Sequence, residues 1–456
     1  MRLCVSAVVS LVLFAAAGCS NDAPSTHVLP AGGARVTGVE RDASSGYAET
    51  LLHRFKSSPD AASPEAGVIL DASGDLFGTT IAGGAHPDCP GGYQNGCGTV
   101  FEIDAAGKER LVYSFAGKPD ASEPFDRLLS SDGVLYGTTA VGGNVSACYT
   151  YGGDGCGTLF KIDAHGHESL LYQFKGNFGS GNGDGQDPMG GVVSDAAGNL
   201  YGSTAYGGKY DYGTLFKITQ RGNESVLYSF SGGTDGGRPY SGAILDAAGN
   251  LYGVTYVGGN SGCLTGCGTV FELSSGGALT TLYRFKGKTD GGNPYGGLVM
   301  DAAGSLYGTA QNYGNINCNK RGGNPGCGTV FKLNAQRKFK LLHVFAGSPD
   351  GAVPSENLTL DQKDDVYGTT SFGGDSSCNG GYSCGVVFKI NTSGLESVLY
   401  TFKGGAHDGE VPYGGLYRDN AGDLFGTTVS GGKGPCQQGC GIVFELIPPA
   451  TEQDAR

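Results

Sequence analysis

The sequence predicts an all-β protein, a seven-bladed β-propeller with four-stranded antiparallel blades. The first observation is a repeat of 55 to 60 residues, marked by the phenylalanines Phe55, Phe115, Phe174, Phe230, Phe285, Phe345 and Phe402. A fixed period of this length is typical of repeat architectures. The second observation is that each repeat holds four strand-like segments, which in the fifth copy are "YGGLVMD", "SLYGTA", "GTVFKL" and "KLLHVF". The third is that the first and last copies are incomplete in complementary ways.

The four segments of a repeat have the pattern of antiparallel strands. The fourth alternates with period 2, as in Val226, Tyr228 and Phe230, which indicates a half-buried strand. The link from the first segment to the second is an Asp-Ala-Ala-Gly turn, such as Asp246 to Gly249, in which glycine can take the positive φ of a short hairpin. Four such strands in each unit make a propeller blade.

The two ends of the repeat region decide between a closed ring and an open solenoid. The region begins with an isolated fourth segment, "ETLLHRF" at 49–55, and it ends with "GIVFELI" at 441–447, which lacks a fourth segment. Pairing 49–55 with 441–447 would complete the seventh blade and leave no open sheet edge between the first and last units. We therefore expect the N-terminal strand to close the ring.

The period and the charge of the chain narrow its class. Residues 49–447 are expected to form one repeat domain, because the period continues across them. Lys and Arg number 30 against 43 Asp and Glu, which gives a net charge of −13 without a basic block. Phosphate-backbone binding therefore has no electrostatic support, and we expect no nucleic-acid partner.

The N-terminus has the features of an export signal. Residues 1–18 contain Arg2 and then the apolar run "VSAVVSLVLFAAA", which is too short for a permanent membrane span. The following "AAGCS" resembles a bacterial lipobox, in which Cys19 would be lipidated and become the mature N-terminus. A plain secretory signal is the alternative. We expect a lipid membrane as partner, location at the outer membrane or cell surface, a flexible tether over 19–48 and a tail over 448–456.

The second and third strand segments resemble a known family. The matching words are "LFGTT" at 76, "LYGTT" at 135, "LYGST" at 200, "LYGVT" at 251, "LYGTA" at 306, "VYGTT" at 366 and "LFGTT" at 424, each followed by a word like "CGTVF". They resemble the GloVer tandem repeat, a bacterial family whose members carry different anchoring devices. The resemblance covers nearly all of residues 49–447. It implies an exported, anchored protein and says nothing of activity.

Twelve of the 14 cysteines fall in pairs, one pair in each of six units. The pairs are Cys89 and Cys97, Cys148 and Cys156, Cys263 and Cys267, Cys318 and Cys327, Cys378 and Cys384, and Cys436 and Cys440. The third unit lacks both members, which indicates that each pair works together. The separations vary and no histidines accompany them, so disulfides are favoured over zinc sites. Six disulfides would require an oxidising compartment.

Residue types that recur in every blade are predicted to be structural. Each connection has an aspartate four residues before a proline: Asp60, Asp120, Asp184, Asp235, Asp290, Asp350 and Asp408. A cation-binding ring is one interpretation, and a cap for each turn is the favoured one. The tyrosines Tyr136, Tyr201, Tyr252, Tyr307 and Tyr367 are predicted to pack between blades.

No catalytic group is predicted from the histidines. His53, His86, His165, His167, His343 and His407 are assigned to different blades and phases of the repeat, as solvated or core side chains. No Ser/His/Asp or Cys/His arrangement is therefore proposed.

The third unit breaks the pseudo-symmetry and carries the candidate site. Its connection from Phe174 to Pro188 spans 14 positions where the others span 9 or 10. There Asn182, Asp184, Gln186 and Asp187 suggest a calcium loop, although a disordered acidic loop is the alternative. In the next loop Tyr206, Lys209, Tyr210, Asp211 and Tyr212 suit a sugar or peptide ligand, or pack where the disulfide is missing.

The leading hypothesis is a lipid-anchored, extracytoplasmic propeller that binds a glycan or peptide ligand, or a partner, without turning it over. No cofactor is expected, apart from the calcium suggested above, and the protein is expected to be a monomer. The alternatives are an enzyme that acts on extracellular polysaccharide, as a lyase or hydrolase, and a structural envelope protein. An enzyme should show a close carboxylate pair in a deep cleft, and only the third unit is expected to offer extra acids.

Overall fold

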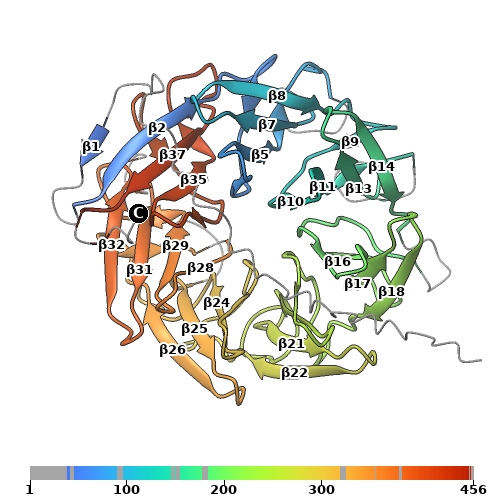
Figure 1. Cartoon of the computed structure of the whole chain (residues 1–456). Helices are drawn as coiled ribbons and strands as arrows, with labels where there is room; N and C mark the ends of the chain where they lie inside the picture. Colours follow the sequence, from blue (N-terminus) through green and yellow to red (C-terminus); the bar gives the residue numbers. More distant parts are fainter. Residues whose placement is uncertain are drawn as a thin grey trace, which may run out of the picture.

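The computed structural model describes residues 39–41, 46–89, 96–144, 148, 155–176, 183–318, 325–354, 356–378, 383–450 and 452. These residues form a closed ring of seven antiparallel sheets around a central channel, and they contain no helix (Figure 1). The seven-bladed propeller is thus confirmed. No helix among the described residues is long and apolar enough to cross a membrane.

Each blade has its strands in sequence order from the channel outwards. The first three blades are β4 (Ile69–Leu70), β5 (Leu76–Thr80), β7 (Thr99–Ile103) and β8 (Glu109–Ser114); β10 (Leu129–Ser131), β11 (Val134–Thr139), β13 (Thr158–Ile162) and β14 (Glu168–Gln173); and β15 (Val193–Ser194), β16 (Leu200–Thr204), β17 (Thr214–Ile218) and β18 (Glu224–Ser229). The next three are β19 (Ile244–Leu245), β20 (Leu251–Thr255), β21 (Thr269–Leu273) and β22 (Leu279–Arg284); β23 (Val299–Met300), β24 (Leu306–Ala310), β25 (Thr329–Leu333) and β26 (Phe339–Val344); and β28 (Thr359–Leu360), β29 (Val366–Thr370), β31 (Val386–Ile390) and β32 (Glu396–Thr401).

The seventh blade is built from both ends of the chain. It contains β34 (Tyr417–Arg418), β35 (Leu424–Thr428) and β37 (Ile442–Ile447), and its outer strand is β2 (Ala48–Arg54). Strand β2 pairs with β37 in antiparallel register from Ala48–Ile447 to Arg54–Ile442, and Figure 1 shows the two strands side by side. The predicted closure by the N-terminal strand is confirmed. Outside it, β1 (Val39–Arg41) adds a fifth strand within the range 19–48 that was expected to be a tether.

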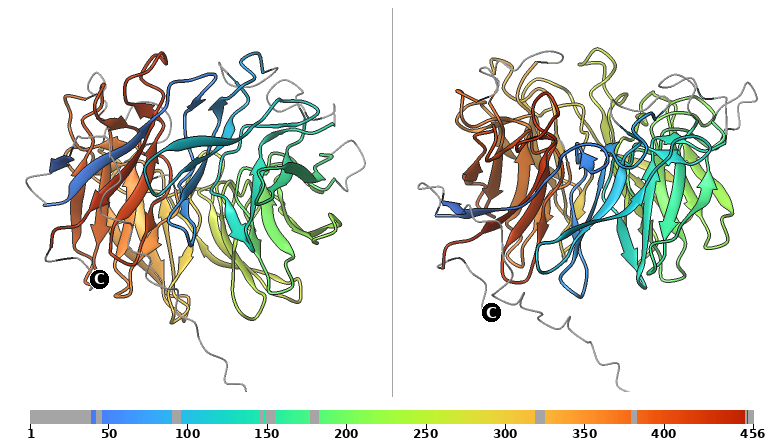
Figure 2. Two further views of the ribbon diagram at one scale, coloured as in Figure 1. Left: turned by 45° about the horizontal axis from the view of Figure 1, so that its top comes forward. Right: turned by 90° about the horizontal axis from the view of Figure 1, so that it is seen from above.

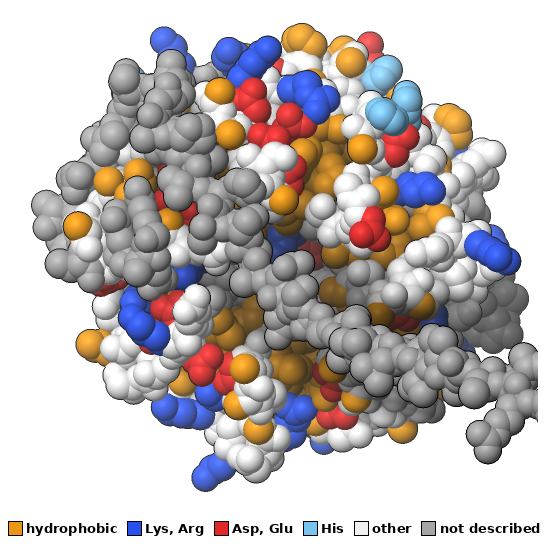
Figure 3. Space-filling view, viewed as in Figure 1, with side chains coloured by type: hydrophobic (Ala, Val, Ile, Leu, Met, Phe, Trp, Pro, Cys, Tyr) orange, Lys and Arg blue, Asp and Glu red, His pale blue; other side chains and the backbone are white. Residues whose placement is uncertain are grey.

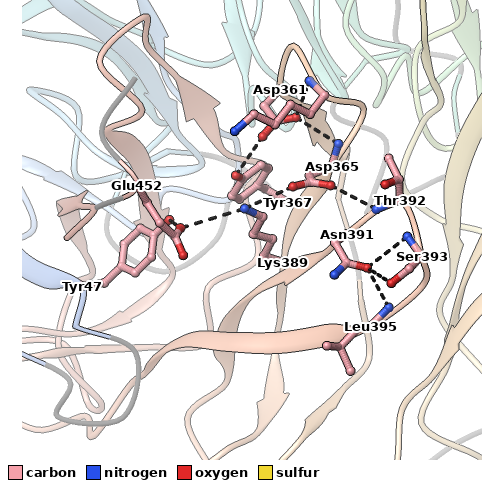
Figure 4. A network of polar contacts seen from close by, with 11 residues as sticks. Tyr47, Asp361, Asp365, Tyr367, Lys389, Asn391, Thr392, Ser393, Leu395 and Glu452 are labelled. Carbon is pink, nitrogen blue, oxygen red and sulfur yellow. Dashed lines mark hydrogen bonds and ion pairs between the residues drawn. The ribbon is translucent and has the colours of Figure 1, made fainter. Parts of the chain in front are cut away.

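A polar network also fixes the two chain ends to blade 6 (Figure 4). The Tyr47 hydroxyl donates to the carboxylate of Glu452 over 3.1 Å. Lys389 Nζ lies 3.1 Å from Asp365 and 3.9 Å from Glu452, and Tyr367 donates to Asp361. Glu452, in the predicted C-terminal tail, therefore holds both the residue before β2 and the strand β31.

The two faces of the ring differ in their connections, as the side views show (Figure 2). On one face lie the hairpin turns, and on the other the connections between blades and the loops between second and third strands. On the second face, four connections add short ladders: β3 (Ala61–Ala62) with β6 (Ala82–Gly83), β9 (Ala121–Ser122) with β12 (Val141–Gly142), β27 (Gly351–Ala352) with β30 (Phe372–Gly373), and β33 (Gly409–Glu410) with β36 (Ser430–Gly431). We call this side the long-loop face.

Pairs of phenylalanines join each blade to the next. The phenylalanine that follows an outer strand packs edge-on against the phenylalanine of the third strand of the next blade, as Phe55 does on Phe101 at 5.1 Å. The same pair recurs at all seven seams, at 5.1 or 5.2 Å. The ring of the second phenylalanine covers the glycine of the "LYGTT" word, so a Cβ at Gly78 would lie 2.4 Å from Phe101. This close approach explains why the word contains glycine.

The residue before each proline joins neighbouring blades through its backbone. Its amide donates to a carbonyl of the preceding blade, that of the residue before the third-strand "GT", as the Glu123 amide does to the Cys97 carbonyl over 3.0 Å. Its carbonyl accepts from an amide of its own blade, as the Glu123 carbonyl does from the Ala140 amide. All seven of these residues have positive φ, from 53° to 61°: Ser63, Glu123, Asp187, Arg238, Asn293, Val353 and Val411. The following proline packs on the glycine of the "CGT" word of the preceding blade, at Gly98 for Pro124.

Deletion of residues 49–55 tests the closure. It would remove the buried Leu51 and Phe55 and leave β37 as an open sheet edge. We expect a loss of about 5 kcal/mol or more in unfolding free energy, from the large-to-small costs of these side chains alone. Calorimetric melting measures it, with a deletion of residues 25–35 as control. A melting profile equal to that of the control would contradict the ring closure.

Candidate binding site at the channel mouth

The residue after each repeat proline lies at the start of an inner strand, on the long-loop face of the channel. The described members of this set are Glu65, Phe125, Met189, Tyr240, Tyr295 and Tyr413. The next two positions are small in most blades, because the inner strands approach one another closely there. A Cβ at Gly67 would lie 2.3 Å from the carbonyl oxygen of Gly415. Neighbouring inner strands are therefore in close contact there, and the larger side chains surround the mouth of the channel.

Four of the six described members of this set are aromatic, and three of them are tyrosines. Tyr240 stacks on Tyr295 with ring centroids 5.2 Å apart, and Tyr295 meets Tyr413 at 5.8 Å. Tyr256 and Tyr206 extend the cluster, since Tyr256 packs against Tyr240 at 5.2 Å and the Tyr206 hydroxyl lies 3.2 Å from that of Tyr240. A chain of five tyrosines thus runs from blade 3 to blade 7.

Three acids face these tyrosines, and they break the repeat pattern. Glu65 replaces the aromatic residue of blade 1, while Asp126 and Glu356 stand where blades 3, 5 and 7 have glycine. Burial, and then the neighbouring Glu123, raise the pKa of Glu65 to about 7. Burial, and then the charge of Asp126, raise the pKa of Glu356 well above its usual range. Arg127 acts on Glu356 in the opposite direction but is exposed.

Two of the three acids share a small hollow with the tyrosines. Asp126 and Glu356 line it together with Tyr240, Tyr295 and Tyr413, and its volume is about 10 Å³. Such a space has room for about one water molecule. The mouth can therefore receive a small group, such as an ammonium, but not a sugar ring. Aromatic faces and carboxylates are both attractive to cations.

These acids were missed from the sequence, where extra acids were expected only in the third unit. That expectation is wrong, because the three acids of the mouth come from blades 1, 2 and 6. The signal that would have found Asp126 and Glu356 is the pair of positions after "Pro-x", which reads Gly-Gly in blades 3, 5 and 7 but Asp126-Arg127 and Glu356-Asn357 in blades 2 and 6. Glu65 stands at the x position, where blades 4, 5 and 7 have tyrosine.

The five candidate residues of the third unit differ in their contacts. Tyr206 belongs to the mouth through Tyr240, and Arg238 lies over its ring at 4.9 Å. Lys209 covers Tyr210, which is 48% exposed, at 4.9 Å, and Asp211 accepts from the Gly207 amide in its own loop. A ligand-binding role for these residues remains a prediction.

Tyr212 occupies the place that a disulfide holds in other blades. In blade 5, Cys318 forms a disulfide with Cys327, and its Sγ atom lies 3.1 Å from the point that a Cβ at Gly347 would occupy. The equivalent glycine of the third seam is Gly232, and there the Tyr212 ring lies 2.5 Å from the same point. The tyrosine therefore packs on the connection in place of the missing cystine, which is one of the two interpretations made from the sequence.

The aspartates before the prolines cap their turns. Asp184 accepts from the Lys175 amide and from the Tyr172 hydroxyl at 2.5 Å, and the other six accept from the equivalent amides. Asp184 and Asp187 are buried, whereas Tyr210 and Tyr212 are exposed. The calcium role of Asp184, Gln186 and Asp187 remains a prediction, and Asn182 lies outside the described residues.

The six cysteine pairs are joined as disulfides, with Cα atoms 5.1 to 5.7 Å apart. Cys19 lies outside the described residues.

The recurring tyrosines pack between blades, as Tyr136 does with Phe174 and Phe216. The assignment of the histidines to different phases is wrong for two of them, because His53 and His343 each lie two residues before the phenylalanine of an outer strand.

The face with the short turns offers a wider but more open hollow. It has a volume of about 420 Å³ between blades 5 and 6, and Lys332, Lys338, Lys340 and Asn391 contribute to its lining. Figure 3 shows this face, with charged side chains of both signs scattered around the ring. The mouth on the opposite face is preferred as the candidate site because its acids depart from the repeat.

The repeat, the ring and its seven seams agree with a match to one family model, that of the Gloeobacter/Verrucomicrobia repeat, at residues 31–181, 146–319 and 313–454. The chain belongs to this family. A search of the curated proteins finds no match.

Solved structures resemble this repeat protein at low sequence identity. A fungal alcohol oxidase of the AA5 family in complex with copper is 11% identical with a TM-score of 0.51, and the match covers 89% of this chain and 78% of that one. A gluconolactonase from Xanthomonas campestris is 11% identical with a TM-score of 0.40, over 89% and 90% of the two chains. The extracellular domain of a hybrid two-component system from B. thetaiotaomicron is 9% identical with a TM-score of 0.49, over 86% and 39%.

The packing role of Tyr212 predicts a stability difference. Tyr212→Ala should lower the free energy of unfolding by about 1 to 2 kcal/mol, less than for a fully buried aromatic because 37% of the residue is exposed. Tyr210→Ala is the matched control and should change it by about 0.5 kcal/mol or less. Denaturant titration measures both, and equal losses would contradict the packing role.

The raised pKa of Glu65 predicts a pH dependence. A carboxyl that binds its proton more tightly in the folded state stabilises the fold below its unfolded value of 4.5, and this contribution is lost as the pH rises to about 7. The melting temperature should therefore fall between pH 5 and pH 8. In Glu65→Gln that fall should be smaller by on the order of 1–2 °C.

The matched control for this effect is Glu102→Gln, on β7 and paired with Arg110 outside the mouth. It should keep the wild-type difference between the two pH values. The pKa values of Asp60 and Asp301 are lowered below 3.8, so these groups do not contribute to a change between pH 5 and pH 8. A fall of the same size in Glu65→Gln as in wild type would show that the carboxyl of Glu65 does not titrate as described.

Proposed function

We propose that the protein is an exported, lipid-anchored propeller that binds a peptide partner through a protonated amine at the channel mouth, without turnover. The observation that carries this proposal is the group of Glu65, Asp126 and Glu356 beside the tyrosines. An ammonium group would supply a counter-charge to carboxyls whose pKa is raised by burial and then by neighbouring acids, and it would meet the faces of Tyr240 and Tyr295.

Disulfides and the N-terminal sequence support the location. Six disulfides indicate an extracytoplasmic protein. The lipobox-like "AAGC" at 16–19 supports attachment through Cys19. Fatty-acid labelling in cells tests the anchor: wild type should be labelled, and Cys19→Ala should be unlabelled. Release of both into the medium without label would overturn it.

Calorimetric titration with a lysine-rich decapeptide tests the binding, with the same peptide acetylated at its lysines as control. The wild type should bind the free-amine peptide, and acetylation should abolish binding because it removes the positive charge. The triple variant Glu65→Gln, Asp126→Asn and Glu356→Gln should bind at least tenfold more weakly, which is about 1.4 kcal/mol.

A charge-matched variant separates a local site from general attraction. Glu102→Gln, Glu272→Gln and Asp132→Asn remove the same number of charges outside the mouth. This variant should keep wild-type affinity. Equal weakening in both triple variants would assign the binding to net charge and contradict a site at the mouth.

A second candidate function is polysaccharide cleavage. Asp126 and Glu356 share one hollow, and the carboxyl with the raised pKa could act as an acid beside the other as a base. The narrow mouth argues against it, because a sugar ring must reach both groups. Reducing-end assays on extracellular polysaccharides test this function. Release that is lost in Glu356→Gln would favour the enzyme over the binding module.

A further inference from the structure

At several seams, three positions from two neighbouring blades come together. They are the residue two before the outer-strand phenylalanine, the capping aspartate, and the first position of the next outer strand. Five seams have tyrosine at the first position, and its hydroxyl donates to the aspartate: Tyr113 to Asp120, Tyr172 to Asp184, Tyr228 to Asp235, Tyr283 to Asp290, and Tyr400 to Asp408. The other two seams have histidine.

These two seams each bring one histidine and two carboxylates together. Between blades 7 and 1 they are His53, Asp60 and Glu109, and between blades 5 and 6 they are His343, Asp350 and Glu396. In each group one nitrogen and two oxygens lie within 4.8 Å of one another. The two groups arose at equivalent positions of a repeat in which tyrosine is the rule.

The distances in both groups are compatible with one shared metal ion. His53 Nε2 lies 3.8 Å from Asp60 Oδ2, which is too long for a hydrogen bond, whereas His343 Nε2 makes a hydrogen bond with Asp350, at 3.2 Å from Oδ2. Two ligands at about 2.0–2.2 Å from a tetrahedral Zn²⁺ lie roughly 3.3–3.5 Å apart. Small side-chain shifts would therefore place all three donors around one ion.

Several donor atoms in these groups are buried without a hydrogen bond. His53 Nε2, Glu109 Oε1 and Glu396 Oε1 make none with the described residues. Burial raises the pKa of Glu109 and of Glu396, as expected for carboxylates that lack a full counter-charge. The remaining group of potential ligands, Cys378, Cys384 and Glu410, differs because its cysteines form a disulfide.

We propose that each of these two seams binds a divalent transition metal of the Zn²⁺ type. One histidine nitrogen and two carboxylate oxygens hold the ion, and water completes a tetrahedral set. The first ion joins β2 to β8, so that it reinforces the seam closed by the N-terminal strand. The second joins β26 to β32. This proposal does not depend on ligand binding at the channel mouth.

The repeat supplies the test variants. Tyrosine is the residue of the other five seams, so His53→Tyr and His343→Tyr should fold. Untagged protein is treated with EDTA, dialysed, titrated with Zn²⁺ and passed through a desalting column, and bound zinc is measured by mass spectrometry. We expect two equivalents in wild type, one in each single variant and none in the double variant. The melting temperature should rise with zinc in proportion to the sites retained.

Two further variants keep the result interpretable. His165→Ala with His167→Ala removes an exposed pair of histidines with rings 6.1 Å apart, and it should keep two equivalents. Glu109→Gln with Glu396→Gln removes one ligand from each site and should weaken zinc binding at least tenfold, even if a tyrosine variant fails to fold. The absence of bound zinc in wild type, or two equivalents in the double tyrosine variant, would overturn the proposal.

Discussion

The backbone of the residue before each repeat proline determines how one blade meets the next. Its amide bonds to the preceding blade and its carbonyl accepts from its own blade, and both bonds form because the residue has positive φ. Asp187, Val411 and Ser63 all adopt this conformation, although their side chains differ in chemistry. Non-glycine residues are uncommon there, and for a β-branched residue the conformation is strained. The same strained conformation occurs at all seven seams with different residue types. The contacts of the seam therefore determine this conformation, and the residue type does not.

The seam also explains the repeated words of the sequence. Glycine in "CGT" is required because it has positive φ and because a Cβ there would meet a second-strand carbonyl oxygen and the proline of the next connection, at 2.3 and 2.9 Å for Gly98. Glycine in "LYG" is required because a phenylalanine ring covers it. The aspartate four residues before the proline caps the turn that leads to this proline. Since all seven seams have these features, they describe the frame of the ring. Differences among blades are then the place to look for function, as at Glu65, Asp126 and Glu356.

Much of the frame could be predicted from the sequence, because repetition shows it seven times. The orphan segment at 49–55 and the incomplete last unit predicted the closure, and the joint loss of both cysteines in the third unit predicted that they pair. The mouth could not be predicted as directly. Glu65, Asp126 and Glu356 are separated by up to 291 positions in the sequence, and only closure of the ring brings blades 1, 2 and 6 around one channel.

The two histidine seams show a different limit of sequence reasoning. His53 and His343 have the same phase, which a comparison of "LLHRF" with "LLHVF" reveals, but their partners do not follow from that comparison. Glu109 reaches His53 only because an outer strand begins beside the preceding outer strand at the rim. Contacts between blades thus combine residues that no single repeat contains.

We infer that the frame and the binding function are separable, and a variant with consensus residues at the mouth tests this inference. Residues 65–67, 125–127 and 355–357 are replaced by Tyr-Gly-Gly, as at 413–415 of blade 7. Melting and binding of the lysine-rich peptide are then measured on the same preparation. We expect a cooperative transition close to that of wild type together with loss of peptide binding. Unfolding of the variant, or wild-type binding by a folded variant, would contradict the claim.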